Sequence, residues 1–227
     1  MEILGRTADS RASRHSLVLT FLFVPTLYAA WIGAWLLELT LQHRLSWMET
    51  SGAQTLYWTL AKLILWVCPA IALIRFSGRK VEDVLGLRRI RSITIWGGGI
   101  GLLLGAVAMA QKATLHQPLF SLTLDWSFCG GVMISPIVEE ITFRGAILGN
   151  LVQRFKFRTA NAMTAIFFLG AHLPGWYFQG RLPQMIVSPF GSLSILVLGW
   201  IFGLVAFKGR STTASTLTHI LNNLANH

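Results

Sequence analysis

The sequence predicts an all-α protein, a polytopic bundle of about seven transmembrane helices. Of its 227 residues, 53% are hydrophobic and only 12% are charged, and the mean hydropathy is +0.58. Soluble globular domains carry about 25% charged residues, so these values exclude that class. The apolar residues form long runs that fill nearly all of the chain, which predicts one membrane domain without an appended soluble domain.

Six apolar runs are each about long enough to cross a bilayer, which takes ~20 residues as a helix. These predicted spans are 16–42, 53–74, 93–111, 127–152, 159–178 and 185–207. A seventh segment, 211–226, is too polar to enter lipid alone. We expect it to span only inside the bundle, with its polar face toward other helices or a cavity. This division leaves residues 1–15 as an N-terminal tail and 16–227 as a single membrane domain.

The basic residues lie unevenly between the predicted spans. Fourteen of the 19 Lys and Arg residues fall in the N-terminal tail and the second, fourth and sixth loops, against three in the alternating loops. This is the positive-inside pattern, and it predicts a cell-membrane protein with a cytoplasmic N-terminus and an outer C-terminus. Topology and anionic lipid therefore explain the net charge of +10, and no nucleic-acid partner is expected.

The fourth span contains two adjacent glutamates and an arginine, in "SPIVEEITFRGAI". Each such residue at the centre of a membrane helix costs about 2.5 to 3.5 kcal/mol, so the three need partners or a task. Glu140 and Arg144 are four residues apart and can pair with each other, most simply as a structural ion pair. Glu139 points about 100° away around the helix. Its partner must therefore come from another helix.

Two later spans offer polar groups that could meet Glu139. Phe168 and His172 share one helix face, as do His219 and Asn223. Counted from the nearest basic residue at the predicted cytoplasmic ends, the glutamate and both histidines fall within the bilayer and could meet. Each polar side chain alone could be buried glue between helices. Together they favour a functional site.

These residues form three motifs that resemble those of a known family. EExxxR in "EEITFR", FxxxH in "FLGAH" and HxxxN in "HILNN" occur in this order on three late spans. The set resembles the CPBP family of intramembrane endopeptidases, which includes CAAX prenyl proteases and bacteriocin-processing or self-immunity proteins. With "VEDVLGLRR" before the third span, the resemblance covers about residues 80–224, the expected protease core.

The resemblance implies a glutamic-type peptide hydrolase that acts on a membrane-anchored or membrane-proximal peptide or protein. The implied catalytic residues are Glu139, His172, His219 and Asn223, and the implied supporting residues are Glu140, Arg144 and Phe168. The first glutamate would take a proton from a water held by the first histidine. The second histidine and the asparagine would donate hydrogen bonds to the oxyanion. No loop selects among a prenylated C-terminus, a bacteriocin leader and a C-terminal sorting segment as substrate.

Several alternatives remain open. Glu139, His172 and His219 also form a ligand set that catalytic zinc sites use, although HExxH is absent and the resemblance favours a metal-free site with no cofactor. A non-catalytic scaffold or a proton-coupled transporter could use the same buried groups, although no internal symmetry supports a transporter.

Two further features of the spans are assigned to packing. We interpret Lys62, in the second span, as a side chain that packs or snorkels. Gly97, Gly101 and Gly105 form a stripe of small residues that indicates close helix packing.

Overall fold

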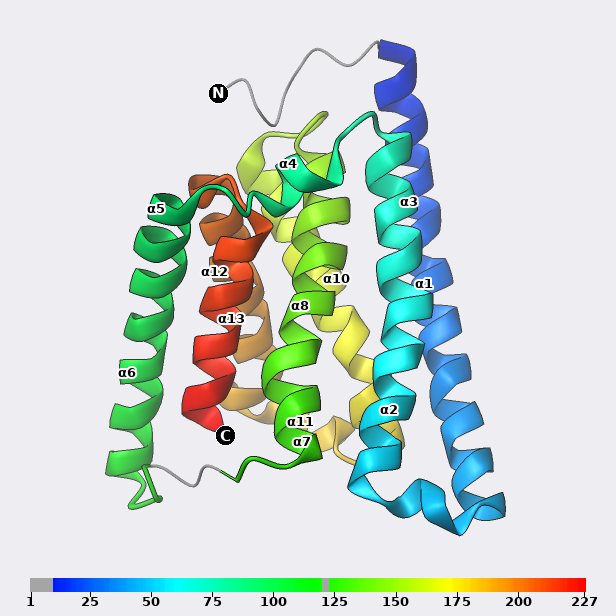
Figure 1. The fold of residues 1–227 in the computed structure, drawn as a ribbon, viewed down its shortest axis with the longest axis vertical. Helices are drawn as coiled ribbons and strands as arrows, with labels where there is room; N and C mark the ends of the chain where they lie inside the picture. The colour runs from blue at the N-terminus through cyan, green and yellow to red at the C-terminus, as the bar shows by residue number, and fades with distance from the viewer. Residues whose placement is uncertain (1–9, 120–122) are drawn as a thin grey trace.

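The computed structural model describes residues 10–119 and 123–227, and every regular element within them is helical (Figure 1). The predicted fold class is therefore confirmed. In chain order the elements are α1 (Ser10–Arg44), η1 (Ser46–Glu49), α2 (Ser51–Lys62), η2 (Leu63–Val67), α3 (Cys68–Phe76), α4 (Val81–Leu85), α5 (Ile90–Ser92), η3 (Ile93–Gly98), α6 (Gly99–Thr114), α7 (Trp126–Phe128), η4 (Cys129–Ile134), α8 (Ser135–Glu140), η5 (Ile141–Leu148), α9 (Gly149–Leu151), α10 (Phe157–Phe178), α11 (Leu182–Val187), η6 (Pro189–Leu193), α12 (Ser194–Gly209) and α13 (Thr212–Asn226).

Consecutive elements join into long helical runs, and four of them correspond to the predicted spans 16–42, 53–74, 93–111 and 185–207. Within the described residues, four helices are long and apolar enough, by length and composition, to cross a membrane: His15–Arg44, Ser51–Phe76, Val81–Thr114 and Phe190–Gly209. Their surfaces expose large apolar side chains such as Leu102, which is 68% exposed. Such a surface is suited to lipid and not to water, so this is a membrane protein.

One predicted span differs from the structure, and part of the predicted N-terminal tail is helical. The predicted span 185–207 is interrupted because α11 ends at Val187 and Ser188 is extended, with ψ 131°. Pro189 follows, and a residue before proline is disfavoured in the α conformation. At the other end of the chain, α1 already begins at Ser10. Residues 10–15 of the predicted tail are therefore helical, and residues 1–9 lie outside the described part.

The polar helix α13 lies inside the bundle, between α6, α12 and α8 (Figure 1). Its side chains Ser215, Thr218 and His219 are buried, as predicted for a segment that enters the membrane only among other helices. Close approach to the helix run 90–114 depends on glycine. A Cβ at Gly97 would lie 2.6 Å from the Ala214 carbonyl oxygen. The assignment of the glycine stripe to packing is confirmed at this position.

Candidate active site

The ion pair predicted within the fourth span is present and fully enclosed. Arg144 Nη1 donates to Glu140 Oε1 at 3.0 Å, and both side chains are 0% exposed. The second amino group, Nη2, donates to the Gly199 carbonyl at 2.9 Å. The guanidinium also lies over the rings of Phe168 and Phe202, 4.4 and 5.4 Å from their centroids. This pair connects the glutamate helix to α10 and α12.

Glu139 finds its partner on α2, as expected for a side chain that points away from Arg144. Lys62 Nζ lies 3.3 Å from Glu139 Oε1 and donates to Ser135 Oγ at 2.5 Å. The Lys62 side chain is only 13% exposed, and its ammonium lies about 6 Å from the ring centroids of Trp31 and Trp66.

This ion pair was not predicted, because Lys62 was interpreted only as a side chain that packs or snorkels. A signal for the contact existed in the sequence. Glu139 and Glu140 share a span that has only Arg144 as its cation, and Lys62 is the other basic residue within a predicted span. Matching charges between spans would have pointed to Lys62.

His219 on α13 bridges the two glutamates. Its Nδ1 lies 3.0 Å from Glu140 Oε1, and its Nε2 lies 3.9 Å from Glu139 Oε2. The ring stacks on Phe202 with a centroid distance of 4.3 Å and an interplanar angle of 23°. A carboxylate can only accept a hydrogen bond, so Nδ1 carries the proton in this contact. Nε2 is then the nitrogen that faces Glu139.

His172 on α10 approaches Glu139 closely enough to interact with it electrostatically, although no hydrogen bond between their side chains occurs in the described part of the chain. Its Nδ1 lies 2.8 Å from the Phe168 carbonyl oxygen of its own helix. Because that carbonyl accepts, Nδ1 donates and Nε2 remains the acceptor nitrogen. The Phe168 ring packs edge-on against the His172 ring, with 4.7 Å between their centroids, and Phe168 is buried.

Asn223 lies one turn beyond His219 on α13, as predicted, but it does not contact the glutamates that His219 contacts in the described part of the chain. Its Nδ2 donates to the Gly131 carbonyl on η4 at 3.1 Å, and its Oδ1 accepts from Asn222 Nδ2 at 3.2 Å. The other six predicted residues form one connected cluster, whereas Asn223 lies at its margin and is held by η4.

The cluster contains two carboxylates, each paired with one basic side chain, so it has no net charge when these four groups are ionised and both histidines are neutral. Within residues 10–119 and 123–227, no three His, Cys, Asp or Glu side chains are grouped so that they could hold a metal ion. The carboxylates, histidines and basic side chains of the cluster can exchange protons and form hydrogen bonds between α2, α8, α10 and α13.

Comparison with known proteins gives a family match. Residues 121–225 match the family model described as type II CAAX prenyl endopeptidase Rce1-like. No match is found among curated proteins or among solved structures. The matched stretch includes all seven predicted site residues, but it begins at 121 and leaves out "VEDVLGLRR", where the resemblance was expected to start near 80. Residues 121–225 of this chain therefore resemble the Rce1-like family of type II CAAX prenyl endopeptidases, as the three motifs predict.

Proposed function

We propose that the protein is an intramembrane endopeptidase in which Glu139 activates a water for attack on a peptide bond. The observation that carries the proposal is the position of the Glu139 carboxylate, held by Lys62 and faced by His219 within a helix bundle. An ionised carboxylate among low-dielectric surroundings is a competent general base once water and substrate reach it. The family match supports protease chemistry for this part of the chain.

The proposed reaction begins with a water between Glu139 and the Nε2 atom of His172. Glu139 takes one proton of the water, and the water oxygen forms a bond to the carbonyl carbon of the peptide. The π electrons of the carbonyl move to its oxygen, which becomes the oxyanion of a tetrahedral intermediate. Collapse of the intermediate breaks the C–N bond, and the proton held by Glu139 passes to the leaving amine.

His219 has a specific constraint in this mechanism. Because Nδ1 donates to Glu140, Nε2 of the neutral ring has no proton and cannot stabilise an oxyanion. His219 donates from Nε2 only as an imidazolium, whose charge the Glu140 carboxylate at 3.0 Å stabilises. We therefore assign to Glu140 a second task besides its pairing with Arg144, which is to support the protonated form of His219.

Asn223 completes the oxyanion site only after a rearrangement. Its amide now donates to the Gly131 carbonyl, so a substrate carbonyl must compete with that backbone oxygen for the same N–H group. Removal of an oxyanion donor typically lowers kcat by about a hundredfold to a thousandfold. A smaller loss in Asn223→Ala would indicate that Gly131 keeps the amide during the reaction.

We propose that Lys62 is a positioning residue. It contacts no atom that changes bonding, but it holds Glu139 Oε1 and leaves Oε2 toward His219. Lys62 lies outside the segment 121–225 that matches the family. The first part of the chain therefore contributes a residue to the site that the family motifs do not include.

The proposed substrate is a peptide or protein anchored in the membrane or lying next to it, because the site is enclosed by membrane helices.

We propose a metal-free mechanism with no cofactor, since Glu139 Oε1 is already paired with an ammonium. Incubation with 1,10-phenanthroline should then leave the cleavage rate unchanged. Inhibition that added Zn²⁺ reverses would contradict the metal-free mechanism.

The test is a comparison of membrane and secreted proteomes from cells that contain the wild-type protein or Glu139→Gln. We expect new peptide termini that require the wild-type glutamate, and their sequences would define the substrate class. Glu38→Gln is the matched control, because Glu38 is a buried glutamate on α1, away from the site. If all three proteins are equally abundant and no termini depend on Glu139, the scaffold or transporter alternative replaces the protease.

A further inference from the structure

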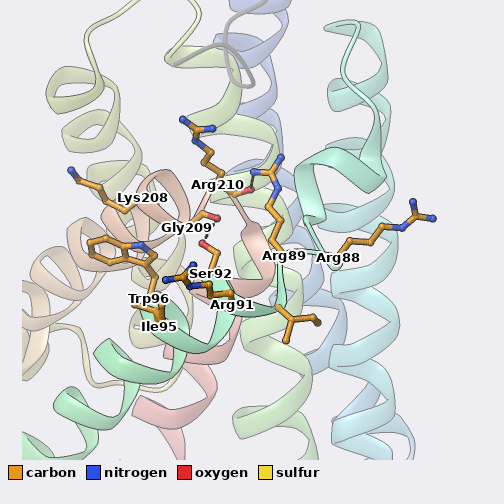
Figure 2. A pocket seen from close by; sticks show the side chains of 10 residues that line it. Arg88, Arg89, Arg91, Ser92, Ile95, Trp96, Lys208, Gly209 and Arg210 are labelled. Atoms are coloured by element: carbon orange, nitrogen blue, oxygen red, sulfur yellow. Dashed lines mark hydrogen bonds between the residues drawn. The ribbon is translucent and has the colours of Figure 1, made fainter.

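A hollow of about 650 Å³ lies where α5 begins and α12 ends (Figure 2). Five basic side chains surround it: Arg88, Arg89, Arg91, Lys208 and Arg210. They come from two segments about 120 residues apart in the chain. Four of these side chains are exposed, and Arg89 is half-buried.

Within residues 10–119 and 123–227, the five cations have no acidic counterpart. In the described part of the chain, no ion pair joins any of them to a carboxylate, even though Glu82 and Asp83 are close in sequence. Like charges repel over the Debye length of about 10 Å at 0.1 M salt. An anion within the hollow would relieve this repulsion.

The frame of the hollow is already assembled. Arg89 Nη1 donates to the Arg210 carbonyl at 2.5 Å, and Ser92 Oγ donates to the Gly209 carbonyl at 2.8 Å. Nearby, Gly86 has φ +64°, and a Cβ there would lie 2.9 Å from the Ser211 side chain. Only glycine permits this close approach of the two segments. A preformed frame needs little ordering when a ligand binds.

The hollow faces both a charged and an apolar environment. The helix run 90–114 begins there, and the positive end of a helix dipole favours an anion. Figure 2 shows the Trp96 ring beside Lys208 at the rim. Ile90 and Ile95, which also line the hollow, are 67% and 56% exposed. Exposed isoleucines below a cationic rim suit a ligand with a charged head and a hydrocarbon chain.

The position in the fold agrees with such a ligand. In Figure 1 the hollow's segments, α5 and the end of α12, lie at the end of the bundle where α1 begins. This is the end that the positive-inside pattern predicts to face the cytoplasm, where anionic lipids attract basic residues. A phospholipid with its phosphate at the rim would extend its acyl chains along the lipid-exposed surface of the helix run 90–114.

We infer that this hollow binds the phosphate headgroup of an anionic phospholipid, with Arg91, Lys208 and Arg210 around the phosphate and Ile90 and Ile95 against its acyl chains. The inference is independent of the proposed protease activity. Arg89 Nη1 donates to the backbone carbonyl of Arg210, so the Arg89 guanidinium belongs to the frame, whereas the Arg210 side chain does not take part in this bond. Figure 2 shows the Arg88 side chain pointing away from Lys208. The charge-bearing contacts are therefore assigned to Arg91, Lys208 and Arg210.

The test uses the full chain purified in a neutral detergent. Phosphatidylglycerol and phosphatidylcholine are added at equal concentration, and the lipid retained by the protein is measured by native mass spectrometry. We expect the wild type to retain phosphatidylglycerol preferentially. A basic residue near an anionic lipid surface contributes roughly a fivefold preference, so Arg91→Gln/Lys208→Gln/Arg210→Gln should lower the preference by about a hundredfold.

The matched control is Arg75→Gln/Lys156→Gln/Arg158→Gln, which removes three exposed cations from the same end of the bundle. It should keep the preference within about twofold of the wild type. Equal loss in both triple variants would overturn the inference, because the effect would then be general surface charge. If the first triple variant does not fold, Arg91→Gln alone must still lower the preference about fivefold.

A second arm separates lipid from free phosphate. Inorganic phosphate at about 50 mM should not displace the bound lipid, because phosphate lacks the acyl chains that Ile90 and Ile95 contact. Full displacement by phosphate would show a site for the soluble anion and would overturn the assignment to lipid. Retention of lipid at this concentration supports it.

Discussion

Replacement of Arg144 by methionine tests whether the buried ion pair holds the site together. Methionine keeps an unbranched chain of similar length but removes the charge and its five donors. The change leaves Glu140 buried with 0% side-chain exposure and only His219 Nδ1 as its partner. It also removes the donor to the Gly199 carbonyl and the cation over the Phe168 ring.

The magnitude follows from this list of partners. Breaking a buried ion pair by removal of one partner costs about 3 to 5 kcal/mol. The remaining contact to His219 compensates part of the loss, so we expect Arg144→Met to lower the free energy of unfolding by about 3 kcal/mol. Neutralising the orphaned partner as well, in Arg144→Met/Glu140→Gln, should recover 1 kcal/mol or more, roughly the size of coupling between contacting residues.

The assay is unfolding in one fixed neutral detergent, followed by circular dichroism and repeated for all variants. Arg181→Met is the control, because Arg181 is exposed and forms only a weak contact with the Met185 sulfur; it should change stability by less than about 0.5 kcal/mol. The reasoning is refuted if Arg144→Met stays within about 1 kcal/mol of the wild type. It is equally refuted if the double variant is as unstable as the sum of its single changes.

Three further predictions concern separate parts of the molecule. Lys62→Met should lower kcat roughly tenfold to a hundredfold with little change in KM, whereas Lys62→Arg keeps the charge and should restore part of the rate in a kinetic assay; equal loss in both would leave Lys62 with a packing role only. Gly97→Ala should destabilise the protein by about 1 to 3 kcal/mol in a thermal-unfolding series, because its Cβ would lie 2.6 Å from the Ala214 carbonyl oxygen, while Gly98→Ala meets no atom within 4 Å and should be neutral or stabilising. Hydrogen bonds from the first turn of α7 and from a neighbouring hydroxyl lower the pKa of Asp125. The ionised carboxylate therefore stabilises the folded state above the ordinary pKa, and this contribution is lost as pH falls through the lowered value. The stability difference between the wild type and Asp125→Asn should shrink below about pH 4, and a difference that stays constant would contradict this prediction.

Local features of the sequence were sufficient to predict the fold class and the candidate residues. Composition and run length identified membrane helices because lipid requires about 20 apolar residues with internally paired backbones. Spacing along one helix predicted the contact of Glu140 with Arg144, since residues four apart share a face. The same periodicity required an external partner for Glu139. The ordered motifs indicated the family, which the match over residues 121–225 confirms.

Contacts between distant segments were decided only by the tertiary structure. Helix periodicity gives the direction of a side chain on its own helix but not the neighbour it meets, so Lys62 remained unassigned as the partner of Glu139. The bridge from His219 to both glutamates depends on the depth at which α13 enters the bundle, which Gly97 permits. The cationic hollow likewise forms because the segments around Arg89 and Arg210 meet. Such contacts depend on helix tilt and rotation, which packing sets and no single span encodes.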